Sequence, residues 1–210
     1  ATGMAMPYMK ATESKGYSRD LCSYFRCNLG HVIEGEGPLD GLPKPDILLA
    51  TGNVCYTRVK WWEVLSHYFK CPLYFIDVPT AGEYSEHSMN YFVSQLEDFI
   101  TFLEGKTGNK LDKKKLQEVM ELSDRAGMLW SEIMEYRKII PCPIGMWDVL
   151  TDMFVLVTYA GTNIPVVFLE KVRDEVKDLV EHKIGVVANE KYRLLFDNIP
   201  PWFNLMLIKY

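Results

Sequence analysis

The sequence predicts an α/β protein built on a parallel sheet, and two features of the chain support this prediction. The first is a strand, a helix and a second strand within about 35 residues (46–79), a unit that demands a parallel pair and a right-handed crossover. The second is a stretch at 90–183 in which apolar residues recur with helical spacing. We therefore expect a Rossmann or flavodoxin-like parallel-sheet domain that carries a large helical insertion.

The strand–helix–strand unit is the clearest part of the pattern. Residues 46–50 form a short apolar run without alternation, which is typical of a strand buried in a parallel sheet. The turn at 51–57 leads into an amphipathic helix at 58–69, and the next strand follows at 72–79. This order places the turn at the carboxyl end of the first strand, where open α/β folds bind their ligands.

The remaining elements are expected on both sides of this unit. Residues 1–20 show no sustained period, so an irregular lead-in is predicted, followed by a helix over 20–29 with Asp20 as its N-cap and Gly30 at its end. Helical periodicity then predicts four further helices, over 90–104, 111–138, 147–159 and 166–183.

The end of the sequence reads as the beginning of another α/β unit. Residues 191–197 look like a strand, followed by a turn and a helical start through Met206. We expect an N-terminal α/β domain with its helical portion over 1–185, and the incomplete start of a second α/β domain over 186–210. A strand without neighbours has an open edge, so the sequence looks cut off.

Composition limits the class of protein. A formal net charge of -5 and a pI near 5.5 argue against nucleic acid or an acidic membrane surface as the main partner. No apolar run reaches the roughly 18 residues that span a bilayer, and the first residues lack the layout of a secretory signal. A cytoplasmic protein is expected.

Five cysteines are the residues most open to a chemical role: Cys22, Cys27, Cys55, Cys71 and Cys142. An odd number in a chain with an ordinary apolar core does not indicate a disulfide framework. Cys55 lies at the strand-to-helix turn, where the helix dipole favours the thiolate that an iron–sulfur cluster or a zinc ion requires. The alternative is a cysteine that only packs, which is the role expected for Cys71 and Cys142.

Polar residues near these cysteines have two possible roles each. Thr51 and Asn53 have the groups to donate hydrogen bonds to a cluster or a substrate oxygen, or to satisfy the turn itself. Arg19, Arg26 and Arg58 have the charge to neutralise a cluster or bind a phosphate, or to form surface ion pairs.

Two cysteine motifs carry a resemblance to a known family. At Gly16-Tyr-Ser-Arg-Asp-Leu-Cys22-Ser-Tyr and Thr51-Gly-Asn-Val-Cys55, with Lys60-Trp-Trp following, the chain resembles subunits of 2-hydroxyacyl-CoA dehydratases and ATP-dependent (class I) benzoyl-CoA reductases. Segment 72–79 fits the family's next strand, and 193–202 is similar to the first strand of its second domain.

The resemblance implies a cofactor and a reaction. In that family three cysteines hold a [4Fe-4S] cluster; Cys22 and Cys55 match the first two, and the third belongs to a later domain that this sequence does not reach. The implied protein is an iron–sulfur dehydratase subunit that works with a homologous second subunit and an ATP-dependent activator. It eliminates water from a (R)-2-hydroxyacyl-CoA through a ketyl radical. The family's catalytic residues are not assigned on this sequence.

Three alternatives stay open at this point. The dehydratase is preferred because the two motifs are most similar to those subunits, and a benzoyl-CoA reductase subunit, which reduces an aromatic ring, stays close behind because both share the cysteine pattern. A non-catalytic subunit that relays electrons or serves a structural role is another class. The last is an α/β protein whose cysteines only pack or bind zinc.

Overall fold

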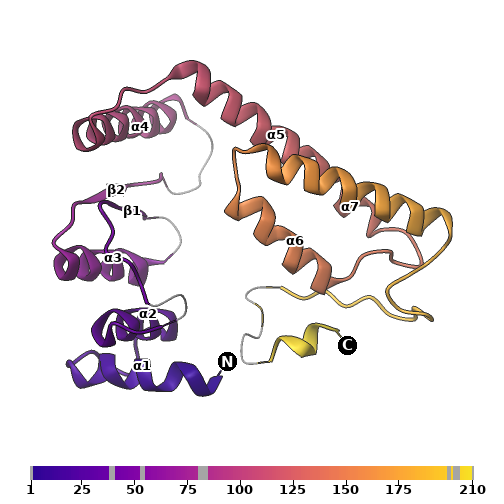
Figure 1. Cartoon of the computed structure of the whole chain (residues 1–210), viewed down its shortest axis with the longest axis horizontal. Helices are drawn as coiled ribbons and strands as arrows, with labels where there is room; N and C mark the ends of the chain where they lie inside the picture. Colours follow the sequence, from indigo (N-terminus) through magenta and orange to yellow (C-terminus); the bar gives the residue numbers. More distant parts are fainter. Residues whose placement is uncertain are drawn as a thin grey trace. The chain divides into compact units, whose positions relative to one another are not determined.

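The structure is a computed structural model that describes residues 2–37, 41–52, 55–79, 85–197, 200 and 204–209 (Figure 1). Its contacts divide the chain into two compact units, Ala1–Lys110 (unit 1) and Leu111–Tyr210 (unit 2). Each unit has its own cluster of buried apolar side chains. The domain boundary at 185/186 expected from the sequence stays a prediction.

Unit 1 contains the predicted strand–helix–strand unit. Its elements are α1 (Thr2–Ser14), α2 (Ser23–Glu34), β1 (Leu48–Thr51), α3 (Tyr56–Phe69), β2 (Leu73–Ile76) and α4 (Glu86–Thr107). β1 and β2 pair in parallel, with Leu48 opposite Leu73 and Thr51 opposite Ile76. The α/β class and the parallel pair are therefore confirmed, as a two-stranded sheet in the part of the chain that is described.

Helices cover the two faces of this small sheet. Figure 1 shows α3 on one side of the strands and α4 on the other. On the α4 side, the Tyr74 ring lies 4.9 Å from that of Phe99 and 5.1 Å from that of Phe102, centroid to centroid. Such aromatic contacts add to the apolar burial that holds a helix on a sheet.

The irregular lead-in predicted for residues 1–20 is wrong, because α1 occupies most of it. This helix has a weak amphipathic pattern and carries Pro7, so its sequence gives little helical signal. It is held instead by contacts with α2. The fully buried Thr12 hydroxyl donates to the Arg26 carbonyl oxygen at 2.6 Å.

The bounds predicted for the second helix are also wrong. α2 begins after Cys22 rather than Asp20, and it continues through Gly30 to Glu34, ending at Gly35 in the left-handed conformation. Gly30 does not end the helix because its missing side chain serves packing. A Cβ there would lie 2.0 Å from the Tyr8 carbonyl oxygen, so only glycine lets α1 and α2 approach so closely.

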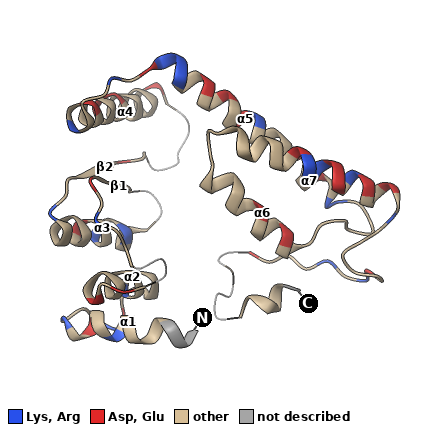
Figure 2. Ribbon diagram, in the orientation of Figure 1, with Lys and Arg blue, Asp and Glu red and all other residues tan. Residues whose placement is uncertain are grey.

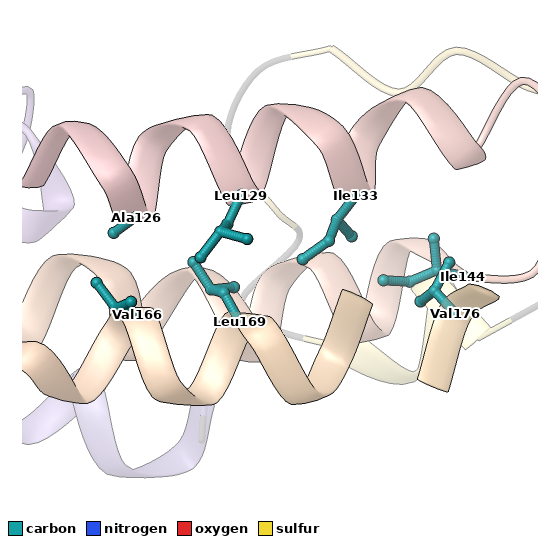
Figure 3. Close-up of a cluster of buried hydrophobic side chains, with 7 residues drawn as sticks. All are labelled: Ala126, Leu129, Ile133, Ile144, Val166, Leu169 and Val176. Carbon is teal, nitrogen blue, oxygen red and sulfur yellow. The ribbon is translucent and has the colours of Figure 1, made fainter. Parts of the chain in front are cut away.

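Unit 2 is helical in its described part, and its core lies between two long helices. The elements are α5 (Lys113–Tyr136), α6 (Met146–Thr158), α7 (Asn163–Glu181) and the short 3₁₀ helix η2 (Leu205–Lys209). Capping side chains start both long helices: Asp112 accepts from two backbone N–H groups of α5, and Thr162 from one of α7. Figure 3 shows the core cluster, which consists of Ala126, Leu129, Ile133, Ile144, Val166, Leu169 and Val176.

Charged residues are distributed unevenly among these helices. Lys, Arg, Asp and Glu are frequent along α5 and α7, whereas α6 carries only Asp148 and Asp152 (Figure 2). The helices expected over 111–138, 147–159 and 166–183 thus occur with bounds shifted by only a few residues.

The strand predicted over 191–197 is absent. These residues lie outside any helix or strand, and Leu194 and Leu195 are 93% and 95% exposed. Near the start of the segment, the Arg193 guanidinium forms an ion pair with Glu190 and donates hydrogen bonds to the carbonyl oxygens of Arg137 and Ile139. The apolar pattern of a strand has no partner to pair with among the described residues, so no ladder forms.

Candidate functional site

Cys55 lies where the sequence predicted it, between a parallel strand and a helix. β1 ends at Thr51, and Cys55 is the N-cap of α3 with φ -150° and ψ 114°. Cys55 is exposed to solvent. Asn53, the other polar candidate of this turn, lies outside the described residues.

The helix terminus stabilises the thiolate of Cys55. The backbone N–H of Arg58 lowers the pKa of this thiol most, followed by the backbone N–H and hydroxyl of Thr57 and by the charge of Arg58. The Cys55 sulfur makes no capping hydrogen bond in the present rotamer, and the Arg58 N–H donates to the Cys55 carbonyl oxygen at 3.0 Å. Thiolate character and exposure are what a metal ligand requires.

Cys22 occupies the equivalent position on α2. It is the N-cap of that helix, with φ -46° and ψ 130°, and its sulfur also makes no capping hydrogen bond. Unlike Cys55 it is only partly exposed, and it packs against the apolar cluster that Phe25, Leu29, Val32 and Leu65 form.

The contacts between α2 and α3 show that the two helices run in the same direction. Near the start of each helix, the ring centroids of Phe25 and Trp61 lie 6.0 Å apart, and the Trp61 indole N–H donates to Asn28 Oδ1 at 2.9 Å. Further along both helices, the Tyr68 hydroxyl donates to the Val32 carbonyl oxygen at 3.1 Å. A step of seven residues along α2, from Phe25 to Val32, thus matches a step of seven along α3.

This arrangement brings the two candidate cysteines to one end of the helix pair. Cys22 lies three residues before Phe25, and Cys55 lies six residues before Trp61. At a rise of 1.5 Å per residue, the positions of the two cysteines along the helix axes therefore differ by about 5 Å. The N-termini of α2 and α3, each with a cysteine at the N-cap position, therefore lie at the same end of the helix pair, and the N-terminus of α3 follows the carboxyl end of β1. Such an end offers unpaired backbone N–H groups to an anionic group.

The arginines of this region separate into two groups. Arg26 Nη1 lies 2.6 Å from Glu13 Oε1, and Arg19 Nε lies 3.4 Å from Glu13 Oε2, so both are ion-paired. Arg58, in the first turn of α3, has no ion pair with any described residue. Of the three, Arg58 is thus the one whose charge is available at the Cys55 end.

The other cysteines have environments unlike these two. Cys71 is buried, as expected of a core residue, and Cys142 donates from its sulfur to the Ile144 carbonyl oxygen at 3.2 Å. Cys27 Sγ lies 3.7 Å from His31 Nε2 on the same face of α2, and burial raises the pKa of this thiol. The four-residue spacing of Cys27 and His31 was the sequence signal of this contact.

Neither a complete metal site nor a membrane span is present in the part of the chain that is described. No group of three or more His, Cys, Asp or Glu side chains there is arranged to hold a metal ion. None of the helices there has both the length and the apolarity to cross a membrane.

A cavity of about 550 Å³ lies elsewhere in unit 1 and contains neither candidate cysteine. It is lined by the segment that follows α1 and by α2 and α3, through Lys15, Tyr17, Leu29, Ile33, Glu63, Val64, His67 and Tyr68.

Comparison with known proteins identifies the family. The family described as "2-hydroxyglutaryl-CoA dehydratase, D-component" matches residues 1–210. The (R)-2-hydroxyisocaproyl-CoA dehydratase alpha subunit of Clostridioides difficile is 34% identical over 194 residues, which cover 90% of this chain and 48% of that protein.

Two further relatives are nearly as similar. The (R)-phenyllactyl-CoA dehydratase alpha subunit of Clostridium sporogenes is 31% identical over 205 residues, 96% of this chain and 50% of that protein. A benzoyl-CoA reductase subunit of Thauera aromatica is 30% identical over 217 residues, 95% of this chain and 48% of that protein. The chain spans about half the length of these curated relatives. The resemblance read from the two cysteine motifs is thus confirmed, and the chain belongs to the 2-hydroxyglutaryl-CoA dehydratase D-component family.

Proposed function

We propose that this chain is part of the iron–sulfur subunit of a 2-hydroxyacyl-CoA dehydratase, which removes water from a (R)-2-hydroxyacyl-CoA. One observation carries the proposal: Cys22 and Cys55 occupy the N-cap positions of two parallel helices, at the same end of the helix pair. The relatives named dehydratase alpha subunits support it, and they favour a heterodimer with a homologous second subunit.

The donor set fits two of the ligands of a [4Fe-4S] cluster. Cys22 and Cys55 would hold it, and the N–H groups of Arg58 and Thr57 that lower the pKa of Cys55 favour the thiolate form that binds iron. The third cysteine ligand would come from the later domain that the family resemblance implies. The wider fold we propose is a Rossmann or flavodoxin-like domain with a helical insertion, of which β1 and β2 are two neighbouring strands.

Three residues near the helix termini have defined parts in this function. When bound, the cluster would supply one low-potential electron, received from an ATP-dependent activator, to the thioester carbonyl of the acyl-CoA. Cys22 and Cys55 orient it at the helix termini. Arg58 places a positive charge without an ion-pair partner among the described residues beside Cys55, and the apolar cluster against Cys22 keeps water from one side of the site.

A second candidate is a subunit of an ATP-dependent benzoyl-CoA reductase. The match to the Thauera aromatica benzoyl-CoA reductase subunit, which is 30% identical and covers 95% of this chain, favours it. The two candidates share the cysteine pair and differ in the net reaction, which is elimination of water without net reduction in the dehydratase and reduction of the aromatic ring in the reductase. A non-catalytic subunit that relays electrons is consistent with the same two ligands.

Anaerobic purification with three cysteine variants tests the proposal. Cys22→Ala and Cys55→Ala are expected to lose most bound iron and sulfide. Cys71→Ala, the matched control in the core, is expected to keep its iron and to lose about 1 kcal/mol of unfolding free energy. Equal iron loss in all three variants, or a colourless iron-free parent protein, would falsify the ligand assignment.

An activity assay then separates the two candidate reactions. The protein, combined with its second subunit and an activator, is supplied with a 2-hydroxyacyl-CoA in one reaction and benzoyl-CoA in another. Formation of an enoyl-CoA supports the dehydratase, and loss of the aromatic absorbance of benzoyl-CoA supports the reductase.

A further inference from the structure

Arg26 connects the segment before Cys22 to helix α1. Its Nη1 lies 2.6 Å from Glu13 Oε1, and its Nε donates to the Leu21 carbonyl oxygen at 3.0 Å. Leu21 directly precedes Cys22 in the chain. One guanidinium group therefore joins the last turn of α1 to the peptide group that leads into Cys22.

Burial of the ion pair and backbone hydrogen bonds strengthen the link that Arg26 makes between α1 and the segment before Cys22. The side chains of Arg26 and Glu13 are only 16% and 22% exposed, so their ion pair is less screened by water and salt than a surface pair. The backbone of Arg26 is held as well: its N–H donates to the Cys22 carbonyl oxygen at 3.0 Å, and its carbonyl oxygen accepts from the buried Thr12 hydroxyl. Arg26 thus donates hydrogen bonds to the carbonyl groups on both sides of the Cys22 Cα, those of Leu21 and Cys22.

We propose that Arg26 is a positioning residue that holds Cys22 at the N-terminus of α2 in the orientation a metal ligand needs, with Glu13 as its anchor on α1. Its guanidinium group contacts Glu13 and Leu21, and it acts on the site only through the Leu21–Cys22 peptide. The inference rests on the proposed function in one respect, that Cys22 is a cluster ligand.

The geometry of the guanidinium group is essential to this role. Arg26 donates from Nε and Nη1 to two acceptors at once, which a planar fork of fixed shape can do. A lysine has a single nitrogen at the end of a flexible chain. It would keep the charge pair with Glu13 but not the bond to Leu21 at the same time. The Arg26→Lys variant therefore keeps the neutralisation of the Glu13 charge and removes the hydrogen bond to Leu21, so it tests the positioning of Cys22 alone.

The first experiment needs no cluster. In iron-free protein, the rate at which iodoacetamide alkylates Cys22 is measured by mass spectrometry relative to that of Cys55 in the same molecules. Arg26→Met and Arg26→Lys are both expected to change the ratio about tenfold, the scale of one lost charge-assisted hydrogen bond. Glu13→Gln, which leaves the bond to Leu21 in place, should change the ratio less.

A matched control is available in unit 2. Arg125 pairs with Glu170 and joins α5 to α7, as Arg26 joins the α2 segment to α1. Arg125→Met also removes an interhelical arginine–glutamate pair, and it should leave the Cys22 to Cys55 ratio within about twofold of the parent value. A ratio that stays unchanged in folded Arg26→Lys and Arg26→Met would overturn the proposal.

The second experiment measures cluster retention in anaerobically purified protein. Loss of the visible absorbance in the presence of a chelator is expected to be about tenfold faster in Arg26→Lys than in the parent, and unchanged in Arg125→Met. Equal rates in Arg26→Lys and the parent would also overturn it. If the parent binds no iron but the alkylation ratio still shifts, the proposed function fails and the positioning role of Arg26 stands.

Discussion

At the scale of single residues, three thiols of unit 1 differ through their backbone surroundings. Cys22 and Cys55 are N-caps, whereas Cys27 lies inside α2, where burial raises the pKa of its thiol. Around Cys55 the N–H groups of Arg58 and Thr57 act in the opposite direction. For Cys27 and Cys55, position relative to the helix end thus sets the direction in which the thiol pKa is shifted.

These opposite shifts predict different pH dependences of alkylation. The thiolate is the reactive form, so a lowered pKa moves the rise in rate to lower pH and a raised pKa moves it to higher pH. In iron-free protein we expect the rate for Cys55 to rise at a lower pH than that of an ordinary cysteine, and the rate for Cys27 at a higher pH. Iodoacetamide labelling with peptide mass spectrometry measures both sites together. The reverse order would contradict this account.

The candidate site was only partly predictable at this scale. Cys55 could be placed because an apolar strand and an amphipathic helix flank it, and Cys22 because of its motif. The bonds of Arg26 to Glu13 and Leu21 could not be predicted, since they depend on a helix that the sequence hardly signals. Whether Cys22 and Cys55 act as ligands or only pack stays a prediction, which iron analysis of the cysteine variants tests.

At the scale of elements, the contact between α1 and α2 depends on one glycine. Gly30→Ala would place a Cβ 2.0 Å from the Tyr8 carbonyl oxygen, so we expect a loss of about 3 kcal/mol or more of unfolding free energy. At Gly127, inside α5, a Cβ would meet open space, and Gly127→Ala should stabilise the protein by about 1 kcal/mol. Chemical denaturation of the two variants measures both effects. Equal effects would argue against a close contact at Gly30.

Some of these elements could be predicted from the sequence and others could not. β1, α3 and β2 could be predicted, because an apolar run typical of a buried strand and the spacing of an amphipathic helix are both visible in consecutive residues. α1 does not, since its stability comes from α2 rather than from its own pattern. The segment 191–197 has the pattern of a strand but no partner among the described residues, and pairing is not a local property.

At the scale of the whole molecule, the two units have separate cores. Leu29 is a buried member of the unit 1 cluster, and Leu169 of the unit 2 cluster. Leu29→Ala and Leu169→Ala are each expected to cost about 2–5 kcal/mol in their own unit. Hydrogen exchange by mass spectrometry should show faster exchange in α2 and α3 for the first variant, and in α5 and α7 for the second. Equal acceleration in both units by either variant would indicate one cooperative structure.

The parallel course of α2 and α3 also has a consequence for chain entropy. Because Cys22 and Cys55 lie at the same end of the pair, a group bonded to both sulfurs would close a loop of about 34 residues that contains α2 and β1. By analogy with a disulfide, such a closure removes freedom from the unfolded chain worth as much as about 4 kcal/mol. A group that binds both cysteines would thus stabilise the fold as well as take part in the reaction. Its removal would destabilise α2 and α3, the helices whose N-termini carry the two cysteines.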